Sequence, residues 1–317
     1  LPCGIAGFMG PFYFRRGTGL QEVWSGVDFE LFQRAKRERA GVHNPGPGHW
    51  QIFLCPEESY GEIVARVLAG QAGTGESAEP WARPGLSLHH PFIAPFGGHG
   101  RRESSQFLDA NRDLRELSFR WLADSLAKAA ELGAEFVVTH LNHGEGVADR
   151  TAALRLARAA LARFAEMATA AGVDVQVEFL GYQPALHEPA DFVELLAERP
   201  QVRLCLDSGH LHRWGQIHGR DPYAAAELLA PLVGSLHLWN VSSAEEYAEK
   251  GHVPVHPTQR VADGYVDVTR IVRTVLAVNP AATVVFEPSV PEGMTAEFIA
   301  AGMAWVGGIV AAARAGL

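Results

Sequence analysis

Short apolar segments that recur along the whole chain are the feature that most constrains its fold. Most are rich in Val, Leu, Ile and Phe, and they lack the alternation of polar and apolar residues that is typical of a strand with one solvent-exposed face. Such segments are typical of parallel strands that are buried on both faces of a sheet. They predict eight strands, at Cys3–Gly7, Val27–Phe32, Leu86–His90, Glu135–His140, Asp174–Phe179, Val202–Leu206, Gly234–Leu238 and Thr283–Glu287.

Helical patterns separate most of these predicted strands. In the clearest, from about Asp149 to Ala171, apolar residues recur every three or four positions and form one stripe, and Gly172 ends the helix. Further helices are expected at Pro56–Leu68, Leu114–Leu132, Pro189–Arg199, Pro222–Leu232, Val268–Leu276 and Thr295–Ala313. This alternation predicts an α/β fold, either a closed barrel or an open doubly wound sheet. No glycine-rich nucleotide motif follows a predicted strand, so the nucleotide-binding version of the open sheet has no support.

Length and composition fit one globular domain. The 317 residues suit a single barrel over residues 1–317, with exposed loops expected at 71–84 and 240–264. The net charge of −9 argues against a nucleic-acid footprint spread over the surface. Three cysteines without metal-type spacing fit reduced thiols in a cytoplasmic protein. No run of 18 apolar residues occurs, so no membrane span is predicted.

Six consecutive predicted strands finish in His, Asp or Glu after their apolar residues. These residues are His89, His140, Glu178, Asp207, His237 and Glu287, with His210 three positions after Asp207. In a barrel the carboxyl ends of the strands meet at one mouth, where active sites lie. Burying several carboxylates together is costly unless a cation offsets their charge. The pattern therefore favours a (β/α)₈ barrel with a divalent-metal site, and mixed His and carboxylate ligands suit Zn²⁺, Mn²⁺, Co²⁺ or Fe²⁺ better than Ca²⁺.

A series of short motifs connects these strand ends to a known family. The strings LSLHHPF, EFVVTHLNHG, VQVEF, LCLDSGH, SLHLWN, VPVHP and VVFEP occur in this order between residues 86 and 290. Together they resemble the xylose isomerase-like TIM-barrel superfamily, and GVDFELF at residues 26–32 is a weaker match. That superfamily contains sugar and sugar-phosphate isomerases and epimerases, and also endonuclease IV (AP endonuclease family 2). The resemblance implies a single (β/α)₈ barrel and a metal-dependent enzyme, and leaves the individual activity open.

The resemblance implies two nested sets of metal ligands. The isomerase-type set is Glu178, Asp207, His237 and Glu287, and the endonuclease-type set adds His89, His140, His210 and His256. In endonuclease IV an Asp stands two residues before the equivalent of His256, where this chain has Pro254, which has no ligating side chain. This departure disfavours a complete three-metal site. One site for Mn²⁺, Co²⁺, Zn²⁺ or Mg²⁺ is expected, and a second or third cation is left open.

The isomerase interpretation makes Glu178 and Glu287 an acid–base pair. A metal would polarise a sugar carbonyl, one glutamate would remove the neighbouring proton, and the other would return it through an enediolate. The substrate would be a small carbohydrate. The residues expected to contact it are His210, His143, Trp239 and Tyr182.

The endonuclease interpretation uses the same residues to cleave DNA at an abasic site, with Glu178 bridging two metals. The features that favour it are His89, His140 and the basic residues Arg34, Lys36, Arg37 and Arg39, followed by His49 and Trp50 as a phosphate-contacting loop. The acidic net charge and Pro254 favour the isomerase or epimerase instead. A barrel that binds a small molecule without turnover is a second alternative. No membrane partner is expected, and an oligomer is left open.

Overall fold

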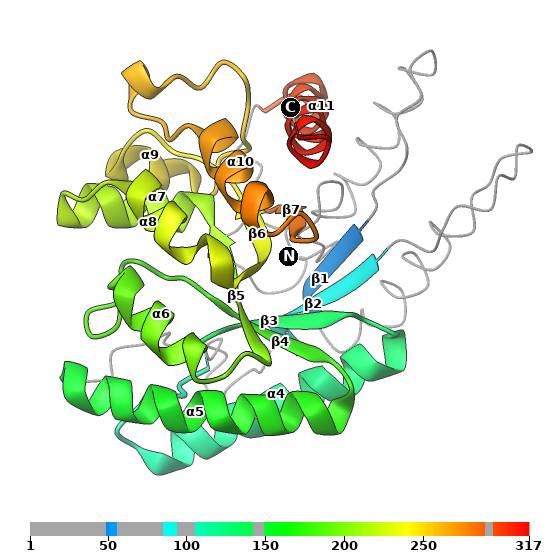
Figure 1. The fold of residues 1–317 in the computed structure, drawn as a ribbon, viewed down its shortest axis with the longest axis vertical. Coiled ribbons are helices and arrows are strands. Elements are labelled where there is room, and N and C mark those ends of the chain that lie inside the picture. Colours follow the sequence, from blue (N-terminus) through cyan, green and yellow to red (C-terminus); the bar gives the residue numbers. More distant parts are fainter. Residues whose placement is uncertain (1–48, 56–84, 94–104, 142–148, 289–293, 317) are drawn as a thin grey trace, which may run out of the picture.

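A single parallel sheet forms the centre of the molecule (Figure 1). The computed structural model describes residues 49–55, 85–93, 105–141, 149–288 and 294–316. The strands within these ranges are β1 (His49–Cys55), β2 (Gly85–Ile93), β3 (Phe136–His140), β4 (Asp174–Glu178), β5 (Val202–Asp207), β6 (Val233–Leu238) and β7 (Thr283–Phe286). Each strand pairs with the next one in the sequence, and β1 also contacts β7, so the sheet curls on itself.

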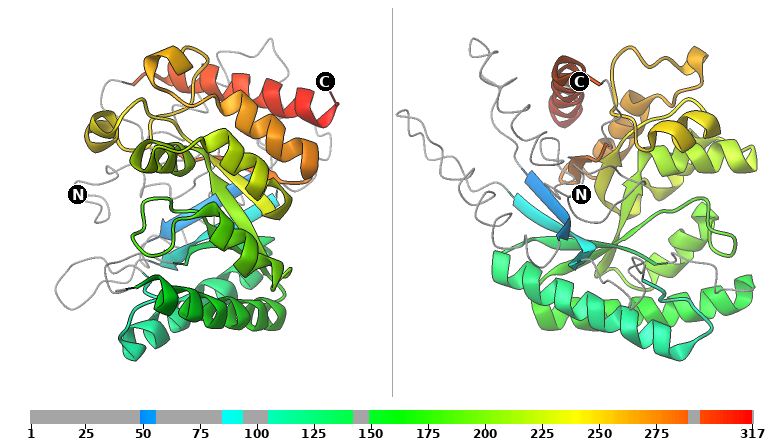
Figure 2. Two further views of the ribbon diagram at one scale, coloured as in Figure 1. Left: turned by 60° about the vertical axis from the view of Figure 1, so that its left-hand side comes forward. Right: turned by 180° about the vertical axis from the view of Figure 1, so that it is seen from behind.

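Most helices flank the curled sheet on its outside (Figure 2). Those described are α4 (Arg112–Leu132), α5 (Arg150–Ala171), α6 (Pro189–Ala197), α7 (Ser208–His218), α8 (Pro222–Leu229), α9 (Ala244–Lys250), α10 (Val268–Val278) and α11 (Ala296–Arg314), with 3₁₀ turns at Ala230–Leu232 and Val261–Asp263. Local sequence fixes their ends. Asp149 caps α5 by accepting from the amide of Ala152 at 2.8 Å. Gly172 ends α5 with φ 66°, a conformation that glycine adopts without strain.

The structure confirms the α/β architecture predicted from the sequence. The six strands predicted from Leu86 onward correspond to β2–β7, and six predicted helices correspond to α4, α5, α6, α8, α10 and α11. The predicted strands Cys3–Gly7 and Val27–Phe32, the predicted helix Pro56–Leu68 and the predicted loop 71–84 lie outside the described residues. The described residues therefore show a curled parallel sheet with flanking helices, which is one part of the predicted eight-stranded barrel.

Strand β1 corrects the interpretation of His49 and Trp50. The endonuclease interpretation placed these residues in a phosphate-contacting loop, but they begin a strand that runs parallel to β2, with His49 beside Gly85. The sequence carries a signal for this strand, since aromatic and aliphatic residues of His49–Cys55 follow a Pro-Gly-Pro-Gly turn sequence at residues 45–48.

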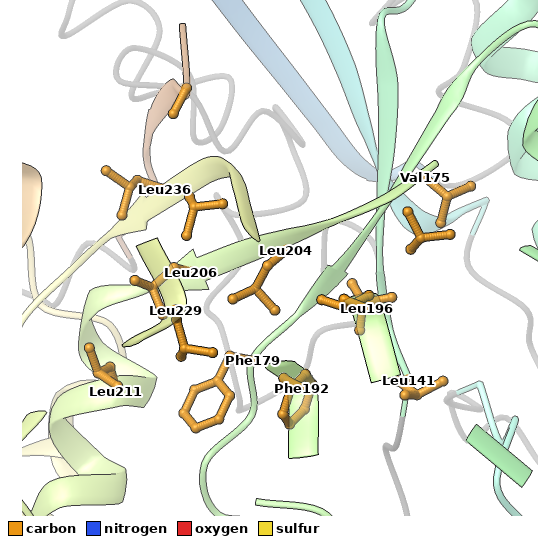
Figure 3. Close-up of a cluster of buried hydrophobic side chains, with 14 of the residues drawn as sticks. Leu141, Val175, Phe179, Phe192, Leu196, Leu204, Leu206, Leu211, Leu229 and Leu236 are labelled. Carbon is orange, nitrogen blue, oxygen red and sulfur yellow. The ribbon is translucent and has the colours of Figure 1, made fainter. Parts of the chain in front are cut away.

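Side chains alternate along each strand between the helices and the interior of the curled sheet. Leu204 and Leu206 of β5 belong to the main buried cluster, together with Leu229 of α8 (Figure 3). Cys205 lies between them in sequence and belongs to a separate small buried cluster. Because the period is two, Asp207 shares the side of Cys205. The same alternation that packs the leucines against the helices therefore directs the strand-end Asp into the interior.

Residues 240–264, expected as an exposed loop, are buried in part. Asn240 and Val253 pair in an isolated antiparallel bridge, and both are buried. Helix α9 lies between them, whereas Val261 near the end of the segment is 58% exposed. The segment is therefore folded and partly buried, with an exposed end.

Helix α11 is, by length and composition alone, the one described helix that is able to cross a membrane, where the sequence led us to expect none. Its Ile299, Val306 and Ile309 are buried in the main core cluster. Gly302 lies so close to Val255 that a Cβ would stand 2.1 Å from the carbonyl oxygen. One face of α11 therefore packs against the rest of the molecule, and only glycine fits at the closest approach.

Three phenylalanines pack helices α4 and α5 together. Phe164 of α5 is fully buried and lies edge-on to Phe107, with ring centroids 4.7 Å apart. Phe119 of α4 lies 5.1 Å from Phe107 and 5.9 Å from Phe164. The Arg163 guanidinium lies 3.9 Å from the Phe119 ring and covers the cluster. Edge-to-face pairs of this kind contribute about 0.5–1.5 kcal/mol beyond their area burial.

This packing predicts a large stability loss for Phe164→Ala. The substitution leaves a cavity between the two helices and should lower the free energy of unfolding by about 3–5 kcal/mol. Leu228→Ala is the matched control, since Leu228 is 48% exposed on α8 and should change the free energy by less than about 0.5 kcal/mol. Denaturant unfolding followed by circular dichroism measures both values. Equal midpoints for the two variants would contradict this account of the core.

Candidate metal centre

Neighbouring strand ends bring the predicted ligands together. His140 at the end of β3 pairs in register with Glu178 at the end of β4. Asp207 at the end of β5 pairs in the same way with His237 of β6. Glu287 directly follows β7, and its backbone amide donates to β6 at 3.1 Å. Residues that are far apart in sequence therefore become neighbours at the carboxyl edge of the sheet.

Glu178 is the residue around which the histidines gather, and its side chain is almost fully buried. The Nε2 atoms of His89 and His140 each lie 3.0 Å from Glu178 Oε2. His210 Nε2 lies 3.4 Å from Oε1, and His237 Nδ1 lies 3.7 Å from Oε2. Burial alone would raise the pKa of Glu178, but His140, His89 and His237 hold that pKa well below its usual range. The carboxylate is therefore ionised.

His237 and Glu287 form a close, buried ion pair whose geometry is poor for a hydrogen bond. His237 Nδ1 lies 2.7 Å from Glu287 Oε2, yet both atoms, and His237 Nε2, are buried and lack a hydrogen-bond partner among the described residues. Burial would lower the pKa of His237, but Cys205 and Glu287 raise it well above its usual value. Burial would raise the pKa of Glu287, but His237 keeps it below its usual value. Buried polar atoms this close and this poorly satisfied are expected where a bound ion completes the site.

Asp207 is a third buried carboxylate, and both of its oxygens accept hydrogen bonds. Oδ1 accepts from the backbone amide of His210 at 2.7 Å, so Asp207 caps helix α7. Oδ2 accepts from Trp239 Nε1 at 2.7 Å. Burial, followed by the charges of Glu178 and Glu287, raises the pKa of Asp207 well above its usual value. A cation beside Asp207 would oppose this shift, because positive charge favours the ionised carboxylate.

Four of these side chains fit one divalent cation. One ligand atom from each of four buried residues lies within 4.8 Å of the others, and these residues are Glu178, Asp207, His237 and Glu287. One imidazole and three carboxylates form a donor set that suits Mn²⁺, Co²⁺, Zn²⁺ or Mg²⁺. The buried atoms of His237 and Glu287 that lack a hydrogen-bond partner within the described part of the chain support the fit independently. This is the isomerase-type ligand set that the sequence resemblance implies.

His89 contributes to a second, overlapping group of ligand atoms. One atom each from His89, Glu178 and His237 lies within 4.8 Å of the others. The His89 and His140 rings lie edge to face, with centroids 4.9 Å apart. His89 Nδ1 lies 3.0 Å from the His90 carbonyl oxygen, a contact that orients Nε2 toward Glu178. Because this group shares Glu178 and His237 with the first, the two groups form one centre.

The residues expected to contact substrate differ in exposure. Tyr182 is 37% exposed, and its ring lies 5.3 Å from the His210 ring. His210 is buried, and its Nδ1 atom has no hydrogen-bond partner in the ranges that the structure describes. Trp239 is fully buried. The His210 and Tyr182 pair therefore lies between the buried carboxylates and solvent.

His256 lies in a different environment from the other predicted ligands. Its ring stacks on Phe298 of α11 with centroids 3.9 Å apart, and its Nδ1 lies 2.7 Å from Thr258 Oγ1. Among the described residues, neither group of ligand atoms includes His256. The predicted substrate contact His143 lies outside the described residues.

Two further buried histidines were not predicted as site residues. His90 lies 2.9 Å from Ser125 Oγ through Nδ1 and 2.5 Å from Ser105 Oγ through Nε2. Burial lowers the pKa of His90 well below its usual value, so this ring is neutral and anchors β2 through the two serines. His252 stacks on Trp239 with centroids 4.0 Å apart. In the sequence, only its position next to His89 in the string LHH indicated a site role for His90. No periodic pattern indicated one for His252.

Comparison with known protein families identifies the family of the chain. The family model described as "Xylose isomerase-like TIM barrel" matches residues 83–306 of the chain. The protein belongs to this family. The matched region contains every strand from β2 to β7, and with them all four ligands of the candidate metal site. None of the curated proteins that were compared matches the chain.

Several solved structures resemble this member of the xylose isomerase-like family. A structure of L-ribulose 3-epimerase has a TM-score of 0.62 and 18% identity, and the match covers 92% of this chain and 91% of that chain. D-psicose 3-epimerase with D-tagatose from Clostridium cellulolyticum H10 has a TM-score of 0.56 and 15% identity, covering 96% and 93%. IOLI protein with a binding zinc atom has a TM-score of 0.59 and 14% identity, covering 82% and 88%. At these identities the likeness shows a shared fold.

A cation that binds the four-residue cluster should stabilise the protein. Adding Mn²⁺ or Co²⁺ to metal-free protein should raise Tm, since a ligand at 100 times its Kd contributes about 2.7 kcal/mol. Glu287→Gln keeps the side-chain shape but removes the charged ligand, and it should remove most of this rise. Glu194→Gln is the control, because Glu194 has a side chain 60% exposed on α6. Thermal unfolding with and without metal measures the effect. An equal rise in wild type and Glu287→Gln would exclude Glu287 as a ligand.

Proposed function

We propose that the protein is a divalent-metal-dependent epimerase or isomerase that acts on a small sugar or sugar phosphate. The observation that carries the proposal is the buried group of Glu178, Asp207, His237 and Glu287, whose ligand atoms lie within 4.8 Å of one another. Glu178 and Glu287 both approach His237, and both have a pKa below the usual value. A protein that only binds a sugar has no need of two ionised, buried glutamates at one point.

The chemistry of this group fits proton transfer next to a carbonyl. A divalent cation held by these four residues would supply a Lewis acid that polarises a sugar carbonyl and acidifies the neighbouring C–H. One of Glu178 and Glu287 accepts the proton from that carbon. The other, carrying a proton, delivers it to the same carbon from the opposite face and inverts the centre. His237 keeps the pKa of Glu287 below its usual value although the negative charge of Glu178 opposes this, so Glu287 is ionised like Glu178 and is able to accept a proton.

We assign His210 and Tyr182 to the recognition of the substrate. His210 lies between Glu178, at 3.4 Å, and the Tyr182 ring, at 5.3 Å between ring centroids. Burial lowers the pKa of His210 to about 3, so the ring is neutral and is able to donate one hydrogen bond and accept another. Its buried Nδ1 atom, unpaired within the described part of the molecule, suits a sugar hydroxyl. Tyr182 is exposed enough to meet the substrate from the solvent side.

The names of the solved relatives support the substrate class. L-ribulose 3-epimerase and D-psicose 3-epimerase with D-tagatose are both sugar 3-epimerases by name. The IOLI protein contains a zinc atom, and a related barrel from Mycobacterium smegmatis is in complex with magnesium. On this basis we propose a ketose as the substrate, with the exchanged proton on the carbon beside its carbonyl.

Proton transfer by the glutamate pair predicts hydrogen exchange with solvent. Metal-loaded protein incubated with L-ribulose or D-psicose in D₂O should place deuterium on carbon 3, which NMR detects. Glu178→Gln should slow this exchange by about 10²- to 10⁴-fold, because an amide cannot accept the proton. Metal content of the variant is measured in the same sample at saturating Mn²⁺, and Glu194→Gln is the control. Exchange at the wild-type rate in Glu178→Gln would contradict the acid–base role.

Phosphodiester cleavage at abasic sites is a second candidate, favoured by one arrangement. The Nε2 atoms of His89 and His140 lie equally close to the same oxygen of Glu178, as expected if this oxygen of a bridging carboxylate shared a cation with the two histidines. Two residues argue against the endonuclease. The His256 ring, a predicted ligand of the endonuclease-type set, stacks on Phe298 instead. Pro254 stands where the endonuclease pattern has a ligating Asp.

Metal content and DNA incision separate the two functions. We expect about one Mn or Co per chain by elemental analysis, in line with the one centre that the ligand atoms form, and no cleavage of an abasic-site duplex. About three zincs per chain together with robust metal-dependent incision would replace the sugar epimerase by an endonuclease IV-like enzyme.

A further inference from the structure

We propose that Trp239 is a positioning residue, which fixes the Asp207 carboxylate in the orientation that binds the metal. The proposal rests on the metal site of the proposed function. It assigns Trp239 a role different from the substrate contact expected from the sequence, because the side chain is fully buried and its indole N–H is directed to Asp207.

The Asp207 carboxylate is held by one donor on each oxygen. The His210 amide donates to Oδ1 at 2.7 Å, and Trp239 Nε1 donates to Oδ2 at 2.7 Å. The first donor is backbone at the start of α7, so no side-chain substitution removes it. The indole N–H is therefore the side-chain donor that sets the rotation of the carboxylate about its last bond. A ligating carboxylate depends on such hydrogen bonds for its orientation.

Trp239 is itself fixed from several sides. Its carbonyl oxygen accepts from Ser208 Oγ at 2.8 Å, and its amide donates to the same oxygen at 3.3 Å. A Cβ on Gly209 would stand 2.2 Å from the indole ring, so glycine is required where α7 meets the ring. On the other side, the His252 ring stacks on the indole at 4.0 Å with an angle of 2° between the planes. The indole therefore has little freedom to turn away from Asp207.

The same stack connects the metal site to the segment that follows β6. Tyr247 of α9 stacks on Trp239 with centroids 5.5 Å apart, and the Arg213 guanidinium lies 4.7 Å from the Tyr247 ring. These rings hold the indole by its faces, whereas the hydrogen bond to Asp207 uses its edge. Replacing the indole by a phenyl ring therefore separates the two contributions, since it keeps an aromatic face and removes only the N–H donor and part of the ring.

Trp239→Phe is the test, with Trp214→Phe as its matched control. Trp214 lies on α7 and is also buried, but its Nε1 atom has no hydrogen-bond partner within the described residues. Both variants lose the same atoms from a buried indole, and only Trp239→Phe loses a bond to a ligand. Co²⁺ titration of the metal-free proteins should give a Kd raised about 10- to 100-fold for Trp239→Phe and unchanged for Trp214→Phe. The visible absorption bands of bound Co²⁺ should also shift in Trp239→Phe alone, because they report the ligand geometry.

The outcomes distinguish this proposal from the one it rests on. If wild-type protein binds no Co²⁺, the metal site fails and the role of Trp239 fails with it. If wild type binds Co²⁺ and the two variants match each other in Kd and absorption bands, only the positioning role is overturned. Gly209→Ala is a second variant that pushes on the indole without changing Trp239 or Asp207, and it should weaken Co²⁺ binding in the same direction. Wild-type affinity in a folded Gly209→Ala protein would also overturn the positioning role.

Discussion

Three carboxylates buried around one imidazole are the constraint on which the rest of this structure depends. Glu178, Asp207 and Glu287 are each at most 3% exposed, and His237 between them is fully buried. Ionised groups removed from water cost several kcal/mol each unless neighbouring charges and hydrogen bonds offset that cost. The chain offsets part of it with the histidines around Glu178 and with the two donors to Asp207. A cation held by these residues, as we propose, would offset the remainder.

The fold supplies the rigidity that such a site needs. Apolar residues on the outer side of the strands pack into one continuous cluster with the helices, while every second residue points inward. Leu206 and Asp207 are adjacent in sequence, and one anchors β5 to the helices while the other faces the candidate metal site. The ligands therefore lie on strands that cannot shift without disturbing the core. Positioning of the carboxylates and stability of the sheet arise from the same alternation.

Much of this architecture was predictable from sequence because its signals are local. Strands β2–β7 are short apolar runs, and each ligand of the isomerase-type set stands at or near a strand end, where the barrel geometry decides its place. Helix α7 was missed because β5 ends at Asp207 and α7 begins at Ser208, so no turn residues separate them. Asp207 serves as strand end, helix cap and candidate ligand at once, and a pattern of apolar residues does not reveal a residue with three roles.

Contacts between distant residues were the part that the sequence could not provide. Trp239 follows a predicted ligand by two positions and was expected to contact substrate, but its N–H reaches a carboxylate 32 residues earlier in the chain. His252 stacks on Trp239 from a segment expected to be an exposed loop. His256 stands next to a motif that suggests a ligand, yet it stacks on Phe298. In each case the partner is set by how β6, α9 and α11 pack together, which no local pattern encodes.

The position of a bound cation tests the central claim most directly. Crystals of the protein grown with Mn²⁺ and measured near the manganese absorption edge should show an anomalous peak bonded to Glu178, Asp207, His237 and Glu287, at distances of about 2.0–2.5 Å. Such a peak would place the metal at the convergence of the buried carboxylates. A well-ordered structure from saturating Mn²⁺ with no peak at these four residues, or with a peak held by other ligands, would contradict the account.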